Sequence, residues 1–405
     1  MSRALCCAAG RSMTKPIRTL ISNVNVVDVM AGGIVRDTCL LMCGGLIAEP
    51  SGPEAIGSLR VVDARGCWAI PSYVDMHAHT TFEGRGHHLP AFSFDEPEDV
   101  SVTRGAQNLI EALRSGVCLV RDVGSRGKRS MLLKELVDTG TILGPELVLS
   151  GEPLCLEGGY GVEFGQTLSH RSLAMVLESH RTQGHEWLKI MNGPQLFDQH
   201  FLGDVVDACH RLGLKVAAHA FTRPGIRDAI QAGVDTVEHG VVFSEHLAGV
   251  SRENRTQFVP TYYCSWISVG ADYITTVDDS AYSTSLRDWH EFLETNLSHH
   301  VRMGMPVFVG TDAGSAPCTF SDITCEIKML SRRGLSALDA IRSATILPAK
   351  ALGREGKYGS ISVGKWANLI LLGGNPLEDI AHVEDVRAIW YRGIIVFNRV
   401  EAPCA

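Results

Sequence analysis

The segment Pro71-Ser-Tyr-Val-Asp-Met-His-Ala-His79 places two histidines directly after an apolar run. The apolar pattern predicts a buried strand from Cys67 to Val74 that leads into His77 and His79. On an extended backbone, residues two apart project from the same face, so both imidazoles can reach one cation. Imidazole nitrogen is a common ligand of zinc and related divalent metals. The alternative is a pair of histidines satisfied by ordinary hydrogen bonds at a strand end.

The chain between residues 68 and 356 repeats a pattern of strand, loop and helix. Besides Cys67–Val74, the candidate strands are Val117–Val120, Leu147–Ser150, Trp187–Met191, Lys215–Ala218, Thr236–Glu238, Phe258–Thr261 and Pro306–Val309. Apolar positions at helical spacing separate them in the runs Ala106–Arg114, Met131–Val137, Leu173–Arg181, Val205–Leu212, Ile226–Ala232 and Leu286–Met303. Eight alternations without a G-x-G-x-x-G turn or a P-loop favour a (β/α)8 TIM barrel over an open doubly wound sheet.

The two ends of the chain carry a different pattern, in which short β-rich runs alternate with turn signals. We expect residues 17–67 and 357–405 to pair into one composite β-sandwich beside a catalytic barrel formed by residues 68–356. Residues 1–16 contain an apolar run that is too short for a signal-peptide core. We expect them to form a disordered N-terminal extension.

Four further residues with metal-binding potential fall in or directly after predicted strands. They are Lys189, His219, His239 and Asp312. The carboxyl ends of the strands of such a barrel meet at one rim, where the chemistry takes place. A lysine inside an apolar strand is expected to be expelled or neutralised, whereas its carbamate, formed with carbon dioxide, is an anionic oxygen ligand. Taken singly, the histidines also suit core positions and the aspartate a turn or helix cap. Their joint placement favours a shared metal site.

Composition limits the partners of this chain. A net charge of -8 argues against nucleic-acid binding, which requires basic patches. No apolar run approaches the roughly 18 residues of a membrane span. The twelve cysteines are scattered and form no C-x-x-C pair, which favours free thiols and a cytoplasmic location.

Several segments resemble the metal-dependent amidohydrolase superfamily, in particular its imidazolonepropionase-like and Xaa-Pro dipeptidase-like (prolidase) branch. The matching stretches are Pro71–His79, Ser115–Gly124, Val216–Phe221, Ala232–Gly240, Val309–Gly314, Ala344–Gly353 and Gly359–Ile370. The resemblance implies a site with two divalent metal ions, by default zinc, bridged by a carboxylated lysine. The more buried metal would be bound by His77, His79 and Asp312. The more exposed metal would be bound by His219 and His239, and the carbamate of Lys189 would bridge the two.

Such a site implies hydrolysis of a C–N amide bond in a small molecule such as a dipeptide or an N-acyl amino acid. A metal-bridging hydroxide would attack the carbonyl carbon, with Asp312 as general base. Phosphotriester, lactone or carbamate-ester hydrolysis at the same binuclear site is the open alternative. Deamination is less favoured because Thr222 stands where related deaminases carry a glutamate. A non-catalytic scaffold is disfavoured because all six ligands are present. Barrels of this kind often pair, so we expect a homo-oligomer.

The sequence departs from the family pattern near the predicted barrel mouth. Glu157-Gly-Gly-Tyr160 stands where many relatives have Gly-Gly-His, and Phe221 stands where dipeptidase-like members often have tyrosine, so the dipeptide substrate is in doubt. Two arginines near the mouth either pair with a substrate carboxylate or form structural salt bridges. The aromatic, turn-rich segment from Tyr262 to Ser285 has the composition of an active-site lid. The candidate substrate-binding residues are therefore Arg121, Tyr160, Phe221, Arg223 and Tyr262.

Overall fold

The computed structural model describes residues 18–50, 59–84, 96–193, 195–270 and 280–400. The extension predicted for residues 1–16 lies outside these ranges. Within them, no helix combines the length and the apolar character that crossing a membrane would require. The nine cysteines in these ranges are all free thiols.

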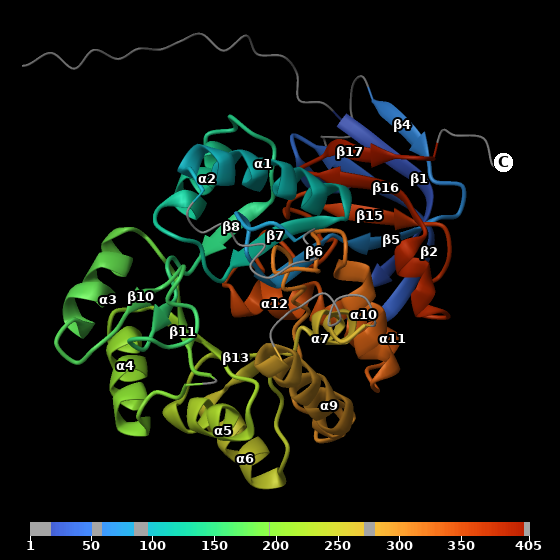
Figure 1. The fold of residues 1–405 in the computed structure, drawn as a ribbon. Helices are drawn as coiled ribbons and strands as arrows, with labels where there is room; N and C mark the ends of the chain where they lie inside the picture. The colour runs from blue at the N-terminus through green and yellow to red at the C-terminus, as the bar shows by residue number, and fades with distance from the viewer. Residues whose placement is uncertain (1–17, 51–58, 85–95, 194, 271–279, 401–405) are drawn as a thin grey trace, which may run out of the picture.

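Strands from both ends of the chain form one eight-stranded sheet. They are β1 (Arg18–Asp28), β2 (Gly33–Cys43), β3 (Leu46–Ala48), β4 (Arg60–Asp63), β5 (Trp68–Pro71), β15 (Leu369–Leu372), β16 (Val386–Tyr391) and β17 (Ile394–Asn398). Their order is β17-β16-β15-β5-β1-β2-β3, with β4 paired to β1. Figure 1 shows the blue N-terminal and red C-terminal strands of this sheet side by side. The antiparallel pairing of Ile70 with Ile370 joins the two ends of the chain. The predicted division into a β-sandwich and a barrel at residues 67/68 and 356/357 stays a prediction.

The segment that leads to the two histidines is two strands, not the single strand predicted from Cys67 to Val74. β5 belongs to the end sheet, and β6 (Tyr73–Ala78) belongs to a separate parallel sheet. The change falls at Ser72, whose N–H donates to Asn368 in the end sheet, while the next N–H, of Tyr73, donates to Gly116. Pro71 has no N–H to continue the first ladder. The strand that carries His77 is thereby anchored to both sheets.

Parallel strands make up the central part of the molecule. They are β6, β7 (Val117–Asp122), β8 (Glu146–Leu149), β9 (Leu154–Cys155), β10 (Gln166–Thr167), β11 (Trp187–Met191), β12 (Lys215–His219), β13 (Thr236–Glu238) and β14 (Gln257–Val259). β6, β7 and β8 form one sheet, and the others form a second in the order β10-β9-β11-β12-β13-β14. Every residue of β6, β7 and β11 is buried. Strands covered on both faces are apolar throughout rather than alternating, as these sequences are.

Single contacts link the edges of the two parallel sheets. Glu186, just before β11, donates its N–H to Leu149 of β8. The predicted strand Pro306–Val309 contributes an isolated bridge between Val307 and Phe258 of β14 rather than a ladder. Val309 then accepts the N–H of Met76 in β6. The described ladders are therefore two sheets with linked edges, and a closed eight-stranded ring stays a prediction.

Helices follow most of the parallel strands, and Figure 1 shows α1 to α6 in succession around their outer side. The helices are α1 (Glu98–Arg114), α2 (Arg129–Asp138), α3 (Leu173–Thr182), α4 (Gln199–Arg211), α5 (Arg223–Ala232), α6 (Glu245–Asn254), α7 (Tyr262–Ser268), α9 (Ser280–Arg302), α10 (Ile323–Arg332), α11 (Ala337–Ser343) and α12 (Ile346–Ala351), with the 3-10 helix η2 (Ile380–Glu384). Side-chain caps fix several starts: Asp198 accepts two N–H groups of α4, and Ser244 accepts one of α6. The six predicted helical runs fall within these helices to within one residue, because their apolar stripes face the strands.

Candidate metal centre

The six predicted metal ligands lie at the carboxyl ends of the parallel strands or inside them, and all six are buried. They come from β6, β11, β12, the residue after β13 and the segment after Val309, and are His77, His79, Lys189, His219, His239 and Asp312. The parallel register pairs Met191 of β11 with His219 of β12. It also pairs His219 with Glu238 of β13. Register thus brings residues far apart in sequence to the same edge.

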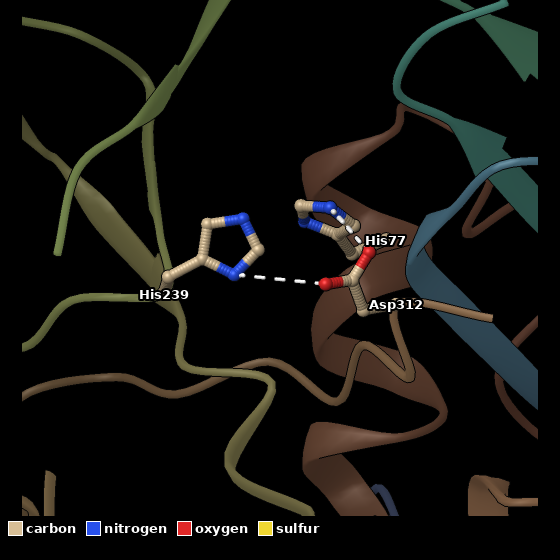
Figure 2. Close-up of side chains that lie close together, drawn as sticks. All are labelled: His77, His239 and Asp312. Carbon is tan, nitrogen blue, oxygen red and sulfur yellow. Dashed lines mark ion pairs between the residues drawn. The ribbon is translucent and has the colours of Figure 1, made fainter. Parts of the chain in front are cut away.

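His77, His239 and Asp312 form the tightest group. One donor atom from each lies within 4.8 Å of the others. Figure 2 shows the Asp312 carboxylate turned toward both imidazoles, with Oδ1 3.4 Å from His77 Nε2 and Oδ2 4.0 Å from His239 Nδ1. These separations are wider than a direct hydrogen bond, which leaves room for an ion between the groups.

The other three predicted ligands adjoin this group. His79 Nε2 is also 3.4 Å from Asp312 Oδ1. The ring of His219 packs edge to face against His239, with centroids 4.5 Å apart. The Lys189 amine is close enough to Asp312 for that carboxylate to raise its pKa. The structure therefore brings the six side chains together, while their assignment to individual metals stays a prediction.

Hydrogen bonds fix how three of the imidazole rings are turned. His77 Nδ1 donates to Glu238 Oε2 at 2.6 Å, and His79 Nδ1 donates to the Gly124 carbonyl at 2.9 Å. His239 Nδ1 lies 2.8 Å from the Thr261 hydroxyl oxygen. In His77 and His79, an N–H committed at Nδ1 leaves the lone pair on Nε2 available to a metal, the arrangement typical of histidine ligands in metalloproteins. In His239, Nδ1 contacts Thr261 and also faces Asp312.

Three non-glycine residues of the site have left-handed backbone conformations. Their φ angles are 69° at His239, 47° at Thr261 and 57° at Asp312. Such conformations are unfavourable for residues with a Cβ and cluster at functional sites, where the surrounding packing holds them. The backbone is therefore strained at the points where it presents the His239 ring, the Asp312 carboxylate and the hydroxyl that orients His239.

Burial and mutual charge set the ionisation of the donors. Burial alone would raise the pKa of Asp312, but the imidazoles of His77, His79 and His239 together hold that pKa well below its usual range. Burial lowers the pKa of His219 and of His239 well below the ordinary value, so both rings are neutral near pH 7. Neutral imidazoles and an ionised carboxylate are the forms that bind a cation.

Unpartnered imidazole nitrogens provide a test of whether these residues fit a metal. His77 Nε2 and His219 Nε2 are fully buried and have no hydrogen-bond partner in the described ranges. A buried polar atom without a partner is costly, and a ligated cation would satisfy it. The donor set of imidazole nitrogen and carboxylate oxygen therefore fits a divalent metal.

Lys189 has the properties of a reactive amine. Burial lowers the pKa of its ammonium group to about 8, although the Glu238 and Asp312 carboxylates oppose that effect. A substantial fraction of the amine is therefore neutral and nucleophilic at weakly alkaline pH, as reaction with carbon dioxide requires.

Glu238 is a functional residue that the sequence interpretation missed. Its carboxylate accepts the Nδ1–H of His77 and two hydrogen bonds from Arg121 Nη2. Burial alone would raise the pKa of Glu238, but Arg121 and His77 hold it well below the usual range. A charged residue directly before His239 in an apolar strand was the available signal, of the same kind that identified Lys189. No feature of the sequence indicated that Thr261 would contact the His239 ring.

Arg121 is a packing residue rather than a substrate contact. It is fully buried, and besides Glu238 its guanidinium donates to the Met76 carbonyl and to Thr236 Oγ1. Its planar group also lies over the Trp187 ring at 4.4 Å. The alternative of a structural salt bridge is the one that the structure supports, because every guanidinium nitrogen already donates to the protein.

We expect Glu238→Gln to destabilise the metal-free protein by about 3–5 kcal/mol, because it leaves Arg121 as a buried cation without its counter-charge. Urea unfolding measures the change. Glu178→Gln is the matched control, because it removes a carboxylate from the exposed Arg181 pair and should leave the unfolding midpoint unchanged. Equal midpoints for the wild type and Glu238→Gln would contradict this account of the network.

Of the other candidate substrate contacts, Tyr160 and Phe221 lie against a predicted metal ligand, and Arg223 does not. The ring of Tyr160 stacks on His219 at 5.1 Å, and Phe221 meets His219 edge to face at 5.3 Å. Arg223 is exposed at the start of α5 and lies over the rings of Phe243 and Phe292. Its role as a substrate contact stays a prediction.

Tyr262 belongs to a different environment. It is fully buried, and its hydroxyl donates to Glu294. With Tyr263 and Trp266 it lines a cavity of about 500 Å³ against α10. Cys264, on the opposite face of α7 by helical spacing, donates its thiol to Asp312 Oδ2 at 3.6 Å. The aromatic residues of α7 thus line that outer cavity, and the segment 271–279 of the predicted lid lies outside the described ranges.

Comparison with known proteins places this site in a family. The chain resembles the solved structure of a Xaa-Pro dipeptidase with methionine bound in its active site, with a TM-score of 0.80, 23% identity, and coverage of 93% of this chain and 99% of that one. It is 22% identical over 418 residues to the imidazolonepropionase of Symbiobacterium thermophilum, across 88% of this chain and 91% of that protein. An uncharacterized protein of Mycobacterium tuberculosis is 25% identical over 306 residues, 72% of this chain and 76% of that protein.

The structural likeness shows a shared fold, and the match to a family model shows the family. Residues 68–396 match the model described as the amidohydrolase family, a range that contains all the strand-end donors and the two sheets that carry them. Because this match covers well over half of the sequence, the chain belongs to the amidohydrolase family.

Proposed function

We propose that this protein hydrolyses a C–N amide bond of a small molecule at a centre of two divalent metal ions. Membership of the amidohydrolase family makes it a metal-dependent hydrolase in general terms. The observation that carries the finer proposal is the convergence of four buried histidines, one aspartate and one buried lysine on the same edge of the parallel strands. A core without a metal would have no reason to collect unpartnered imidazole nitrogens there.

In this proposal His77, His79 and Asp312 would hold one ion and His219 and His239 the other, and Lys189, as its carbamate, would supply an anionic oxygen ligand; zinc suits these donors. Metal ions at such a site lower the pKa of a water and polarise a substrate carbonyl. Asp312 takes the proton of the attacking water and passes it to the leaving nitrogen. Glu238 and Thr261 hold the rings of His77 and His239 in place.

The same proposal includes a closed (β/α)8 barrel with a smaller β-domain from both chain ends, a homo-oligomer and a cytoplasmic location. The pairing of both chain ends in one sheet supports the architecture. Size-exclusion chromatography with light scattering tests the oligomer.

One observation favours amide hydrolysis over deamination. Thr222 occupies the position three residues after His219, and its hydroxyl accepts the Gly225 N–H at the start of α5. A helix-capping hydroxyl cannot take the general acid and base role of a glutamate at that position.

The direct test is a panel of substrates with zinc-loaded protein: dipeptides, N-acyl amino acids, lactams and aryl amides beside lactones and phosphotriesters. We expect turnover of amides that is lost on chelation and restored by zinc. Turnover of phosphotriesters or lactones alone would replace amide hydrolysis with the alternative reading of the site.

We expect metal retention to be nearly the same at pH 6.0 and pH 7.5. A histidine with an ordinary pKa near 6.5 would be mostly protonated at pH 6.0, but the lowered pKa values of His219 and His239 keep both rings neutral there. Equilibrium dialysis against a weak chelator measures retention across this range. A marked loss between these two pH values would show that the rings titrate as ordinary histidines.

A further inference from the structure

Aromatic rings pack against two of the predicted metal ligands, His79 and His219. Tyr160 stacks on His219 with an interplanar angle of 29°, and Phe82 stacks on His79 with centroids 4.9 Å apart and an angle of 4°. Phe164 meets both His79 and Phe82 nearly at right angles, at 6.3 and 5.3 Å. His79 and His219, one assigned to each metal, therefore have an aromatic ring stacked on them.

Tyr160 and Phe164 come from the same loop, between β9 and β10, and the loop is held in place. The Tyr160 N–H donates to Gln195 Oε1 at 3.1 Å, and the Gly165 N–H donates to the Gly161 carbonyl at 2.8 Å. A Cβ at Gly165 would lie 2.5 Å from Cys155 Sγ, so the loop is packed closely against β9. The loop backbone that carries the two rings is thus held beside the site.

The exposure of Tyr160 shows where this surface faces. The residue is 40% exposed although its ring covers His219, which is only 8% exposed. Tyr160 therefore remains partly accessible to solvent while its ring packs on a buried ligand, and this makes the ring a candidate platform beside the site. Aromatic platforms favour planar aromatic partners, because stacked and edge-to-face pairs add to the free energy of burial.

Building on the proposed function, we propose that the substrate carries a planar aromatic group on the acyl or amine half of its amide, and that this group stacks on an aromatic shelf formed by Tyr160 and Phe164. The shelf determines specificity and takes no part in bond cleavage. It adjoins His219, so the aromatic group lies beside the scissile carbonyl when that carbonyl reaches the metal centre.

Matched amides that differ in planarity test the shelf. N-benzoylglycine is compared with N-cyclohexanecarbonylglycine and N-acetylglycine, and acetanilide with N-cyclohexylacetamide, using zinc-loaded protein. We expect kcat/KM to be higher for the aromatic member of at least one pair. Tyr160→Ala should lower kcat/KM for that member by about tenfold more than it lowers kcat/KM for N-acetylglycine, whereas Tyr160→Phe should keep the preference. Trp266→Ala is the control, because it removes an exposed ring from the cavity beside α7. It should change neither kcat/KM for the aromatic substrate nor the preference over its saturated partner.

Binding measurements separate failure of this inference from failure of the proposed function. Calorimetry compares benzoate with cyclohexanecarboxylate on the zinc-loaded wild type and on Tyr160→Ala. If no amide is hydrolysed but benzoate binds more tightly than cyclohexanecarboxylate, and Tyr160→Ala removes this difference, then the proposed reaction is wrong and the shelf is supported. If amides are hydrolysed without preference for planar groups and the two acids bind equally, the shelf is overturned. Equal losses in Tyr160→Phe and Tyr160→Ala would also overturn it, because the hydroxyl rather than the ring would then be responsible.

Discussion

Asp312→Asn is expected to lower kcat for amide hydrolysis by about 10²–10⁴-fold, the range typical for loss of a general base. The amide that replaces the carboxylate cannot accept the proton of the attacking water. Its remaining oxygen can still face His77 and His79, so the metal content should be largely preserved. Steady-state kinetics combined with metal analysis of the same preparation measures both quantities.

Asp228→Asn is the matched control for this substitution. Asp228 is also a buried aspartate, but it lies on α5 and pairs with Arg227. The change should leave kcat within about twofold. A near wild-type rate for Asp312→Asn would remove Asp312 from the role of general base. If the variant lost metal and activity in parallel, Asp312 would act only as a metal ligand.

Lys189→Ala is expected to reduce the protein to at most one tightly bound ion per chain and to lower activity by at least about a hundredfold, the upper range for loss of groups that only support ligands. The reason is that the bridging oxygen ligand would be lost together with the amine. The truncation also leaves a cavity in β11, where the lysine side chain is buried. Propionate should enter that cavity, supply a carboxylate in place of the carbamate and restore part of the activity.

Lys189→Met separates loss of the ligand from damage to the core. Methionine fills nearly the same volume, so this variant should fold normally, be equally inactive and show no rescue by propionate. Activity in Lys189→Met comparable to the wild type would show that the amine has no part in the metal centre. For the wild type, the lowered amine pKa predicts that added bicarbonate raises metal occupancy at pH 8.

Much of the site could be predicted because its residues violate local rules of burial. A lysine in the apolar strand Trp187–Met191 and histidines at the ends of two neighbouring strands have no ordinary place in a core. Parallel strands bring their carboxyl ends to one edge, so the convergence of these residues followed from the strand assignment. The prediction failed where the chain changes sheet within one residue. Ser72 and Tyr73 donate to different sheets, and no local pattern separates that case from one continuous strand.

Residues that act through long-range contacts escaped the sequence interpretation. Arg121 was a candidate for substrate binding, yet its guanidinium is taken up by Glu238, 117 positions later in the chain. Tyr262 was a candidate for substrate binding in a predicted lid, yet its hydroxyl meets Glu294. In both cases the sequence shows the side chain but not which acceptor the fold places beside it.

The sequence by itself determined the candidate donor residues and the alternating strands and helices that carry them, because these depend on residue type and on short-range periodicity, while its resemblance to the amidohydrolases indicated the class of chemistry. Only the tertiary structure decided which arginine is buried, how Glu238 and Thr261 turn the imidazoles, and which aromatic rings stand over His219 and His79. Most of those properties arise from contacts between residues more than twenty positions apart, such as Tyr160 with His219 and Glu238 with His77, and their energies depend on burial and distance, which no local stretch of sequence contains.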